Sequence, residues 1–534
     1  MPVRSLFPLG RDRHIDLSQP TQTDILVIGG GPAGSYAASA LAREGFSVTL
    51  LEKDFFPRYH IGESMLPSCR PFLRFIGAEE KLVKHGFTVK VGAAVKLNQH
   101  KREGYTDFIT PDPEKAAFNV IRSEFDELLL RHAASSGARI FEGVSVSSIG
   151  FAANQPVSAE WTRRDSSQLH TESRGTIKFT WLVDASGRNG IMSTRYLRNR
   201  KFNQALRNVA FWGYWTGAGV YQPGTRRENA PWFEALTDES GWAWFIPLHN
   251  GTVSVGVVMN EEASRARKTA PTSVKEHYLA QLPLAPGLVR LLGKAQLASE
   301  IKSAGDYSYA ASAYAGPHFR IAGDAGAFID PFFSSGVHLA FTNALSAAAT
   351  IAASIRGECS ESEAARFHNE KTGTSYTRFL LVVLSIYKQI NAQAAPVLSD
   401  IEEDNFDRAF DFLRPVIQGT ADSAHSATEL TETTIQRTMD FCSHALGPTT
   451  PEMAASVSQR VPHALLAPDG PLLATQDVVQ LADGDDEAKH VLWRVNARKA
   501  VDGIYDWERN FRSEKLGGWV VRLETGRLGL VRQG

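Results

Sequence analysis

The sequence predicts an α/β protein with a Rossmann-type nucleotide-binding domain, a sheet-rich second lobe and a mainly helical C-terminal region. Short aliphatic runs that end in glycine or other small residues begin at residues 24, 181 and 319, which is typical of buried parallel strands that open into ligand-binding turns. Aromatic and β-branched residues dominate 201–310 and favour the strands of a second sheet. Further along, apolar residues recur at helical spacing in Ser375–Ile390 and Phe406–Ile417.

The strongest single element is the segment from Asp24 to Glu52. An apolar run is followed by a glycine-rich turn, a small-residue helix and a second apolar run that ends in an acid. This order is the complete dinucleotide-binding unit, in which glycines let a pyrophosphate approach and the helix N-terminus attracts its negative charge. The acid at the end is expected to accept ribose hydroxyls. The predicted cofactor contacts are Gly29, Gly30, Gly31, Ala33, Gly34 and Glu52.

A second group of residues distinguishes FAD from NAD. The apolar run that begins at Phe319 ends in Gly323-Asp324 and leads, past a proline and a glycine, into an Ala-rich helix. This pattern resembles the second flavin fingerprint of FAD-dependent monooxygenases, and Arg122, at the start of another helix, resembles their arginine segment. The resemblance implies that FAD is the cofactor. It places Asp324 on the ribityl chain, Arg122 at the cofactor and the N–H of Val337 toward the flavin ring.

These motifs are spread from residue 24 to residue 355, so the FAD-binding domain is expected to be interleaved with other material. We expect this aromatic-hydroxylase-like domain to occupy residues 24–200 and 311–358. The sheet-rich substrate lobe would occupy 201–310. Residues 1–23 would be an N-terminal extension, and 359–534 a C-terminal region that shapes the substrate site.

Three further clusters narrow the prediction to one family. They are Pro57–Ser68, Gly86–Ala93 and Gly241–Pro247. The last matches the pattern Trp-x-Trp-x-Ile-Pro, and Lys90 lies in the pattern Phe-x-x-Lys-x-Gly. With the FAD fingerprints, these clusters resemble the flavin-dependent halogenases, in the phenol and polyketide branch whose fungal members include the radicicol-pathway halogenases.

The resemblance implies an enzyme that uses reduced FAD, O2 and chloride or bromide to make a hypohalous acid. A separate flavin reductase would supply the reduced FAD. The acid would travel to Lys90, which holds it by a hydrogen bond or as a haloamine beside an electron-rich phenol. Lysine suits both forms because its ammonium donates and its neutral amine can be halogenated, and an apolar site would lower its pKa. By residue type alone, Lys90 would be an ordinary solvated strand residue.

Other site residues follow from the same resemblance. The family places its halide on the backbone of the turn before the Ala-rich helix, here Ser335 and Gly336, where free N–H groups attract anions. Trp242 and Trp244 would form a wall between flavin and substrate, although alternate residues of a strand can equally be core. In Pro57–Ser68, Glu63 is the better candidate for a cofactor contact.

The sequence also bears on the substrate. Phe333 stands where the tryptophan halogenases carry a glutamate. A phenol can lose its own O–H proton during ring attack, so a carboxylate that stabilises the intermediate matters less. This favours a phenolic over an indolic substrate. The resemblance to the fungal members implies a free phenolic polyketide, with a carrier-protein-bound acyl group as the alternative. The base that deprotonates the phenol is left open among Asp400, Asp404, Asp469 and Asp477.

Two other functions fit part of the pattern: an FAD-dependent aromatic hydroxylase on the same fold, and a flavin-binding or carrier-docking module without catalysis. Composition excludes further classes. The 57 Lys and Arg against 58 Asp and Glu leave no basic excess for binding nucleic acid. Three scattered cysteines are too few for a disulfide framework or a four-Cys zinc site, so no metal site is expected.

The sequence favours a protein without a membrane span. The longest apolar stretch, His338–Ile355, is rich in Ala and carries polar residues, which favours a buried helix. No signal-peptide pattern is evident in the first 23 residues, so the expected location is the cytoplasm.

Overall fold

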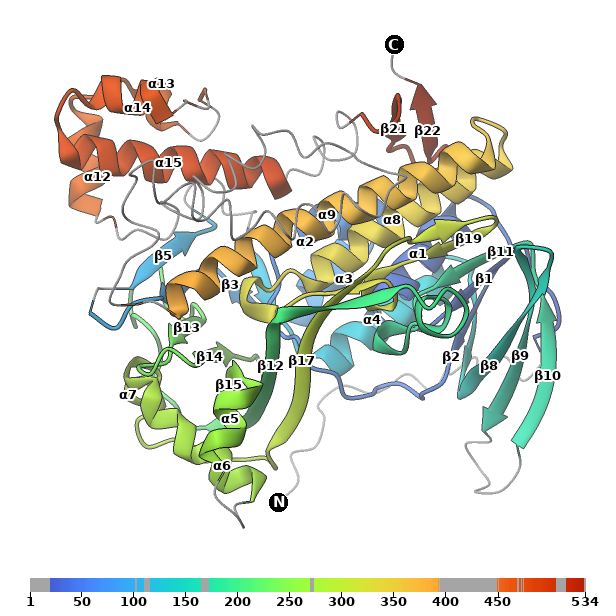
Figure 1. Cartoon of the computed structure of the whole chain (residues 1–534), viewed down its shortest axis with the longest axis horizontal. Coiled ribbons are helices and arrows are strands. Elements are labelled where there is room, and N and C mark those ends of the chain that lie inside the picture. Colours follow the sequence, from blue (N-terminus) through green and yellow to red (C-terminus); the bar gives the residue numbers. More distant parts are fainter. Residues whose placement is uncertain are drawn as a thin grey trace.

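A computed structural model describes most of the chain (Figure 1). The long helices α8 (Gly336–Ile355) and α9 (Glu361–Ile390) lie side by side across the molecule, next to two large sheets. The described residues are 20–100, 103–109, 116–164, 172–268, 273–391, 393, 449, 451–467, 470–471, 473, 475–505 and 515–532.

A six-stranded sheet forms the nucleotide-binding domain. Its strand order is β18-β19-β11-β1-β2-β7, and all neighbouring pairs except β18 and β19 are parallel. Central strands of such a sheet are buried on both faces, which explains the nearly continuous aliphatic residues. The Rossmann-type prediction is confirmed. The bounds are β1 Ile25–Ile28, β2 Val48–Glu52, β7 Arg139–Glu142, β11 Trp181–Asp184, β18 Ala315–Gly316 and β19 Phe319–Ile321.

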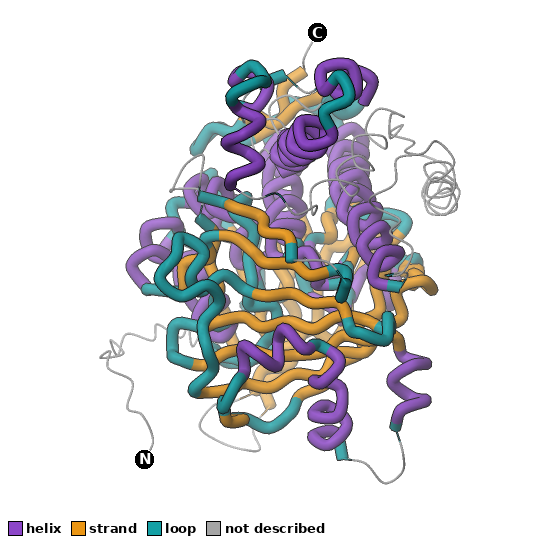
Figure 2. The backbone as a smooth tube through the Cα atoms, turned by 90° about the vertical axis from the view of Figure 1, so that its left-hand side faces the viewer, coloured by secondary structure: helices purple, strands orange, loops and turns teal. Residues whose placement is uncertain are grey.

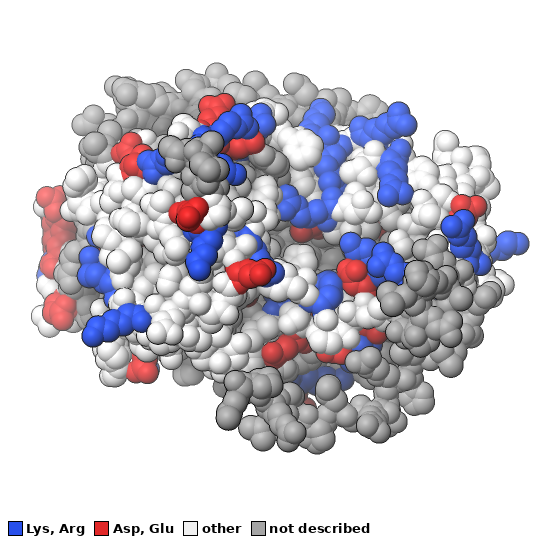
Figure 3. Space-filling model, turned by 90° about the horizontal axis from the view of Figure 1, so that it is seen from below, with Lys and Arg blue, Asp and Glu red and all other residues white. Residues whose placement is uncertain are grey.

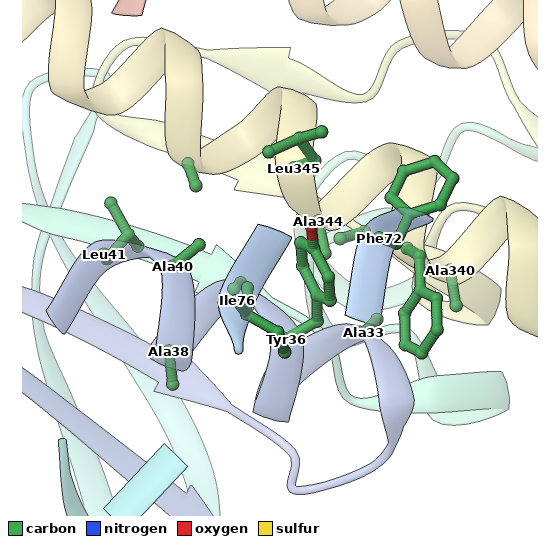
Figure 4. Packing of buried hydrophobic residues seen from close by; sticks show 14 of the residues in the cluster. Ala33, Tyr36, Ala38, Ala40, Leu41, Phe72, Ile76, Ala340, Ala344 and Leu345 are labelled. Carbon is green, nitrogen blue, oxygen red and sulfur yellow. The ribbon is translucent and has the colours of Figure 1, made fainter. Parts of the chain in front are cut away.

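Helix α1 (Pro32–Arg43) packs closely against α8 because small residues line both helices (Figure 4). Tyr36 fills the space between them and lies 6.0 Å, ring to ring, from Phe72 of α2 (Cys69–Ile76). Although α8 is long and apolar enough to cross a membrane, 94% of its apolar window is buried inside the fold. Its composition is therefore that of a core helix, as predicted.

A nine-stranded sheet forms the second lobe, seen in Figure 2 with helices over its outer face. Its order is β20-β17-β12-β15-β14-β13-β4-β5, with β16 paired to β12. Residues 92–107 and 327–328 join this sheet as well as 201–310. The bounds are β4 Gly92–Lys96, β5 Gly104–Asp107, β12 Arg200–Thr216, β13 Trp232–Ala235, β14 Gly241–Pro247, β15 Thr252–Asn260, β16 Gln296–Leu297, β17 Lys302–Ala311 and β20 Ala327–Phe328.

Smaller elements complete these two lobes. A two-stranded ribbon of β3 (Thr88–Lys90) and β6 (Ala117–Asn119) flanks β4 and β5 in the sequence. Helices α5 (Glu261–Arg267), α6 (Val274–Gln281) and α7 (Pro286–Leu292) belong to the second lobe. The remaining elements are α3 Glu79–His85, α4 Arg122–Ser135, β8 Val144–Ala152, β9 Gln155–Arg164, β10 Glu172–Lys178, and the short helices Gly187–Asn189, Met192–Tyr196, Leu282–Leu284, Gly323–Ala325 and Pro331–Phe333.

The described part of the C-terminal region is mainly helical, as expected. Helix α9 includes the predicted helix at 375–390, whereas 406–417 lies outside the described residues. Helices α12 (Pro451–Ser458), α13 (His463–Leu466), α14 (Thr475–Ala482) and α15 (Asp486–Tyr505) share a small apolar core.

The chain then ends in a hairpin of β21 (Trp519–Arg522) and β22 (Gly529–Arg532), which the sequence analysis did not predict. Its apolar side chains, among them Leu516, Val521 and Leu530, belong to the same core cluster as α1 and α8. The last strands of the chain therefore complete the FAD-binding domain.

Glu44, which follows α1 directly, binds this hairpin through hydrogen bonds. Its buried carboxylate accepts hydrogen bonds from the N–H groups of Gly526 (2.7 Å) and Leu528 (2.9 Å) and from Arg356 (2.8 Å). We expect Glu44→Gln to lower the free energy of unfolding by about 2 kcal/mol, because charge-assisted bonds at one oxygen are lost. Chemical denaturation measures this. Glu524→Gln, at an exposed ion pair of the same hairpin, should be nearly silent, and equal effects would contradict the assignment.

Candidate active site

The glycine turn after β1 is built for close approach. Gly29 has a φ of +103°, and a Cβ on Gly34 would lie 1.8 Å from the Gly29 carbonyl oxygen. A Cβ on Gly31 would meet only the Arg58 guanidinium, at 3.4 Å, so that glycine faces open space. Ala33 is buried in the first turn of α1. The turn therefore leaves the N-terminus of α1 open to a phosphate group.

Glu52 lies at the end of β2 and reaches back to this turn. Its carboxylate accepts hydrogen bonds from the N–H of Gly30 at 2.6 Å and of Asp54 at 2.8 Å. Burial raises the pKa of Glu52, and these two bonds oppose that rise. Because each carboxylate oxygen has a second lone pair, Glu52 can still accept from ribose hydroxyls.

Arg122 opens α4 and is almost wholly buried. It forms a two-pronged ion pair with Asp126, at 2.8 and 3.0 Å, and donates to the Ile61 carbonyl oxygen at 2.8 Å. Arg58 binds the same carboxylate at 2.9 Å. Burial alone would raise the pKa of Asp126, but the two guanidinium groups reverse this and lower it. The pair therefore positions Arg58 over the glycine turn, a residue that the sequence analysis missed.

The second fingerprint converges on the same region. A Cβ on Gly323 would lie 3.0 Å from the Ala33 side chain and 3.6 Å from that of Ala340, so this turn sits between the starts of α1 and α8. Asp324 follows it, and burial raises the pKa of its carboxyl. Val337 is buried in the first turn of α8. The structure therefore brings the first glycine turn together with the start of α8.

The turn before α8 has the features of an anion site. Ser334 adopts a left-handed φ of +55°, a strained conformation that for a non-glycine residue is typical of functional sites. The Ser335 side chain is fully buried, and its hydroxyl has no hydrogen-bond partner among the described residues. A Cβ on Gly336 would meet nothing within 4 Å. A buried hydroxyl beside open space and a helix N-terminus fits a small anion next to a bound ring.

Lys90 ends β3 with only 2% of its surface exposed. Its Nζ donates to the Ser64 hydroxyl at 2.8 Å and to the Met65 carbonyl oxygen at 2.9 Å, and it lies 5.3 Å from the centre of the Phe108 ring. Burial lowers its pKa to about 7. A neutral amine has two N–H bonds and one lone pair. Because both N–H groups of Lys90 can be used in these two hydrogen bonds, its lone pair would remain available for reaction.

Trp242 and Trp244 are adjacent on one face of β14, with ring centres 5.8 Å apart. Trp242 packs edge-on against Phe332, which belongs to the turn before α8, at 5.0 Å. Trp244 donates to the Ser254 hydroxyl at 3.1 Å, and Gly256 leaves room for its ring, since a Cβ there would lie 2.2 Å away. The indole pair is thus buried core and also contacts the candidate anion turn.

These residues fit a bound FAD. The glycine turn, the buried Ser335 hydroxyl and the open space at Gly336 all face the edge where the parallel strands end. Open α/β sheets bind their ligands at this edge. Arg122 donates to both Asp126 oxygens and to the Ile61 and Gly62 carbonyl oxygens, which hold it in the wall of this region.

Comparisons with known proteins identify the family. A family model described as an FAD binding domain matches residues 22–375. Flavin-dependent halogenase armH1 of Armillaria mellea is 62% identical over 526 residues, covering 96% of this chain and 99% of that protein. The chain belongs to the flavin-dependent halogenases. It is therefore an FADH2-dependent enzyme that uses FAD and halide.

Two further relatives place the halogenase within this family. Sulochrin halogenase gedL of Aspergillus terreus is 47% identical over 542 residues, covering 97% of this chain and 94% of that protein. Among solved structures, the myxobacterial chondrochloren halogenase CndH superposes with a TM-score of 0.63 at 27% identity, covering 80% of this chain and 98% of that chain.

A chain of hydrogen-bonded side chains leads in this halogenase from the buried Glu63 to the exposed Tyr59. Tyr214 donates to the Glu63 carboxylate at 2.6 Å, and the Tyr59 hydroxyl lies 3.0 Å from that of Tyr214. Burial raises the pKa of Glu63 to about 7. The next residue, Ser64, holds Lys90. Neighbouring residues of this one segment therefore contact the Tyr214 network and the lysine.

Sequence reasoning missed Tyr387 of α9. Its hydroxyl donates to Asp330 at 2.6 Å and accepts from Trp242 at 2.8 Å and from Asn208 at 2.9 Å. No local motif marks a tyrosine that meets its partners only in the fold. Of the four candidate bases, Asp477 is exposed on α14, and Asp400, Asp404 and Asp469 lie outside the described residues.

Tyr387→Phe tests whether this hydroxyl positions Trp242 and the 330–336 turn. We expect retained FAD binding, a several-fold rise in the KM for halide and a smaller change in kcat, because Asp330 caps that turn by accepting from the Phe332 N–H. Steady-state kinetics over a chloride series measures the split. Tyr376→Phe, on the same helix, is the control. An unchanged KM for halide would remove Tyr387 from this role.

Proposed function

We propose that this halogenase makes hypohalous acid from chloride or bromide and relays it through Lys90 to a phenolic polyketide. The observation that carries the proposal is the buried Lys90 amine, with a pKa of about 7, held by the segment that also contains Glu63. Reduced FAD, supplied by a separate flavin reductase, together with O2 would provide the oxidising equivalents.

The chain's own residues would hold the cofactor in two places. The glycine turn of Gly29 to Gly34 and Glu52 would bind the pyrophosphate and ribose, with Arg58 over the turn. Asp324 and Val337 would meet the ribityl chain and the ring, and Glu63 would lie at the flavin. Arg122 would keep the wall between these groups rigid through Asp126.

The halide would lie on the turn of Ser335 and Gly336. An anion there would accept hydrogen bonds from backbone N–H groups at the α8 N-terminus and from the Ser335 hydroxyl, which no described residue of the protein engages. Trp242 and Trp244 would separate the flavin from the substrate. This supports release of a diffusible reagent in place of direct oxygen transfer to the ring.

Lys90 would then deliver the halogen. As an ammonium it can donate a hydrogen bond to HOX; as a neutral amine it can displace water and form an N–X bond. The electron-rich ring attacks the halogen, the nitrogen keeps the electron pair of the broken bond, and the ring loses its proton. A pKa of about 7 supplies both protonation states at neutral pH.

A free phenol is the proposed substrate. The name of one relative gives sulochrin as its substrate, and Phe333 at the halide turn supports a ring that needs no added carboxylate. On the face seen in Figure 3, Lys and Arg lie among Asp and Glu over much of the surface and gather at the upper right. We place the reaction in the cytoplasm, where Cys69 and Cys359 stay as free thiols.

A product assay tests the proposal. The FAD-loaded enzyme receives a flavin reductase, O2, chloride and either sulochrin or a carrier-bound phenol, and products are read by mass spectrometry. The expected product shows the chlorine isotope pair on the free phenol. A product that gains oxygen instead would indicate an aromatic hydroxylase, and chlorination restricted to the carrier-bound substrate would overturn the free-phenol assignment.

A further inference from the structure

Three potential metal ligands from separate elements meet away from the flavin site. His85 is the last residue of α3, Glu124 lies in the first turn of α4, and His249 lies in the turn between β14 and β15. Both imidazole Nε2 atoms lie 3.2 Å from the same Glu124 carboxylate oxygen. The three ligand atoms all lie within 4.8 Å of one another.

The distances suit a shared ion. In a tetrahedral site with bonds of 2.0–2.2 Å, neighbouring ligand atoms are about 3.4 Å apart. Within the described part of the chain, neither 3.2 Å contact is aligned as a hydrogen bond, and neither ring has another polar partner. Two imidazoles that converge on one carboxylate oxygen, without a linear hydrogen bond, are typical of groups that face a common centre.

Phe87 fixes both rings. It stacks on His85 with a centroid distance of 4.1 Å and an angle of 5°, and it meets His249 edge-on at 5.2 Å. The two imidazoles are perpendicular, with centroids 5.6 Å apart. Because Phe87 is itself 3% exposed, the ligands are held by packing before any ion binds.

We propose that His85, Glu124 and His249 bind a zinc ion that ties the second lobe to the FAD-binding domain, with water completing the coordination. Two neutral imidazoles and a carboxylate suit zinc, whereas magnesium and calcium prefer oxygen ligands. The ligand side chains are 22–38% exposed, which gives the ion a path from solvent.

The position gives the ion a structural role. His85 lies five residues before Lys90 and Glu124 two residues after Arg122, while His249 follows the strand of Trp242 and Trp244. A bound ion would therefore join the α3 end, the α4 start and the β14–β15 turn. The sequence analysis expected no metal site because the cysteines are few and scattered. It missed these three ligands, which are far apart in the chain and form no local spacing pattern.

Zinc titration of the FAD-loaded full chain tests the site. After chelator treatment, calorimetry with zinc chloride above the ordinary imidazole pKa should give one equivalent bound, with a rise in Tm. His85→Ala, His249→Ala and Glu124→Gln should each weaken zinc binding by at least about tenfold and abolish the Tm rise. The matched variants His463→Ala and Glu127→Gln should bind zinc like the parent.

Two results would overturn the proposal: no zinc bound by the parent chain, or zinc binding that survives all three ligand substitutions. An equal rise in Tm with magnesium chloride would also contradict the proposal, because magnesium prefers oxygen ligands and would not need the two imidazoles. Where a variant folds poorly, cobalt is bound to the parent chain instead. Visible absorption of the tetrahedral type supports the site, and the weak octahedral spectrum rejects it.

Discussion

Lys90→Met is expected to lower halogenation by about 10³-fold, which is about 4 kcal/mol at 1.4 kcal/mol per tenfold change, while FAD stays bound. Methionine matches the length and apolar character of the buried stem but cannot donate to HOX or form an N–X bond. Single-turnover product yield, read beside the flavin absorption spectrum, measures both quantities. The exposed Lys84, replaced by methionine, should leave the yield unchanged.

The substitution Lys90→Arg distinguishes two roles of Lys90: donating a hydrogen bond as a cation, and losing a proton to form a haloamine. Lys90→Arg keeps a cation that can donate to HOX but cannot deprotonate in proteins, so we expect it to remain nearly inactive if the haloamine route operates. Substantial activity in Lys90→Arg would instead support delivery by hydrogen bond alone. Full activity in Lys90→Met would remove the lysine from the mechanism.

The lowered pKa of Lys90 also predicts a pH dependence. If the neutral amine reacts, the rate should rise with pH through about 7. The free energy of unfolding should depend on the same group. Between pH 7 and the unfolded-state pKa of 10.5, Lys90 is protonated in the unfolded chain but largely neutral in the folded one. As the pH rises through this interval, the free energy of unfolding of the wild-type protein should therefore increase relative to that of Lys90→Met. A pH-independent difference in unfolding free energy would show that Lys90 does not titrate there.

Arg122→Met is expected to cost about 3–5 kcal/mol of stability and to release FAD, because Asp126 would remain buried with only Arg58 as its partner. Denaturant titration and the flavin content of the purified protein measure the two effects. Arg131→Met, on the same helix but with a 42% exposed side chain, loses its bonds to Glu127 and to the buried Glu142 and should cost only about 1 kcal/mol. A similar loss in both variants would contradict the special role of Arg122.

The same substitution has a spectroscopic readout. The charge of Arg122, together with burial, lowers the pKa of His60 to about 4. Removing that charge should raise the pKa of His60 toward its ordinary value, which NMR titration of the imidazole resonances can follow. A variant that merely loosens the fold would also expose His60, so Arg131→Met serves as the reference.

Local patterns were sufficient for the nucleotide-binding unit and for the pairing of the two indoles. In β1 to β2 the order of apolar run, glycines and acid is encoded within thirty residues, and in β14 the two-residue period places Trp242 beside Trp244. The burial of α8 could also be predicted, because its polar residues are spread along an Ala-rich stretch.

Non-local contacts could not be predicted in this way. The parallel pairing of Ala94 with Trp232 brings β4 into the second sheet, and no signal within either strand specifies that partner. Tyr387 and Arg58 are likewise ordinary residues in the sequence and acquire partners only when distant elements pack. The tertiary fold determines which residues form such contacts, and a single sequence carries no local signal for these partners.

The C-terminal hairpin determines when the core of the FAD-binding domain can be completed during synthesis of this enzyme. Domains usually fold from the N-terminus while the ribosome is still adding residues. Here β1 emerges first, yet Leu516, Val521 and Leu530 of the same core emerge last. Part of this apolar core therefore stays uncovered until residues 516–530 have been synthesised. Premature termination before the hairpin would leave the core of the cofactor domain without these three side chains.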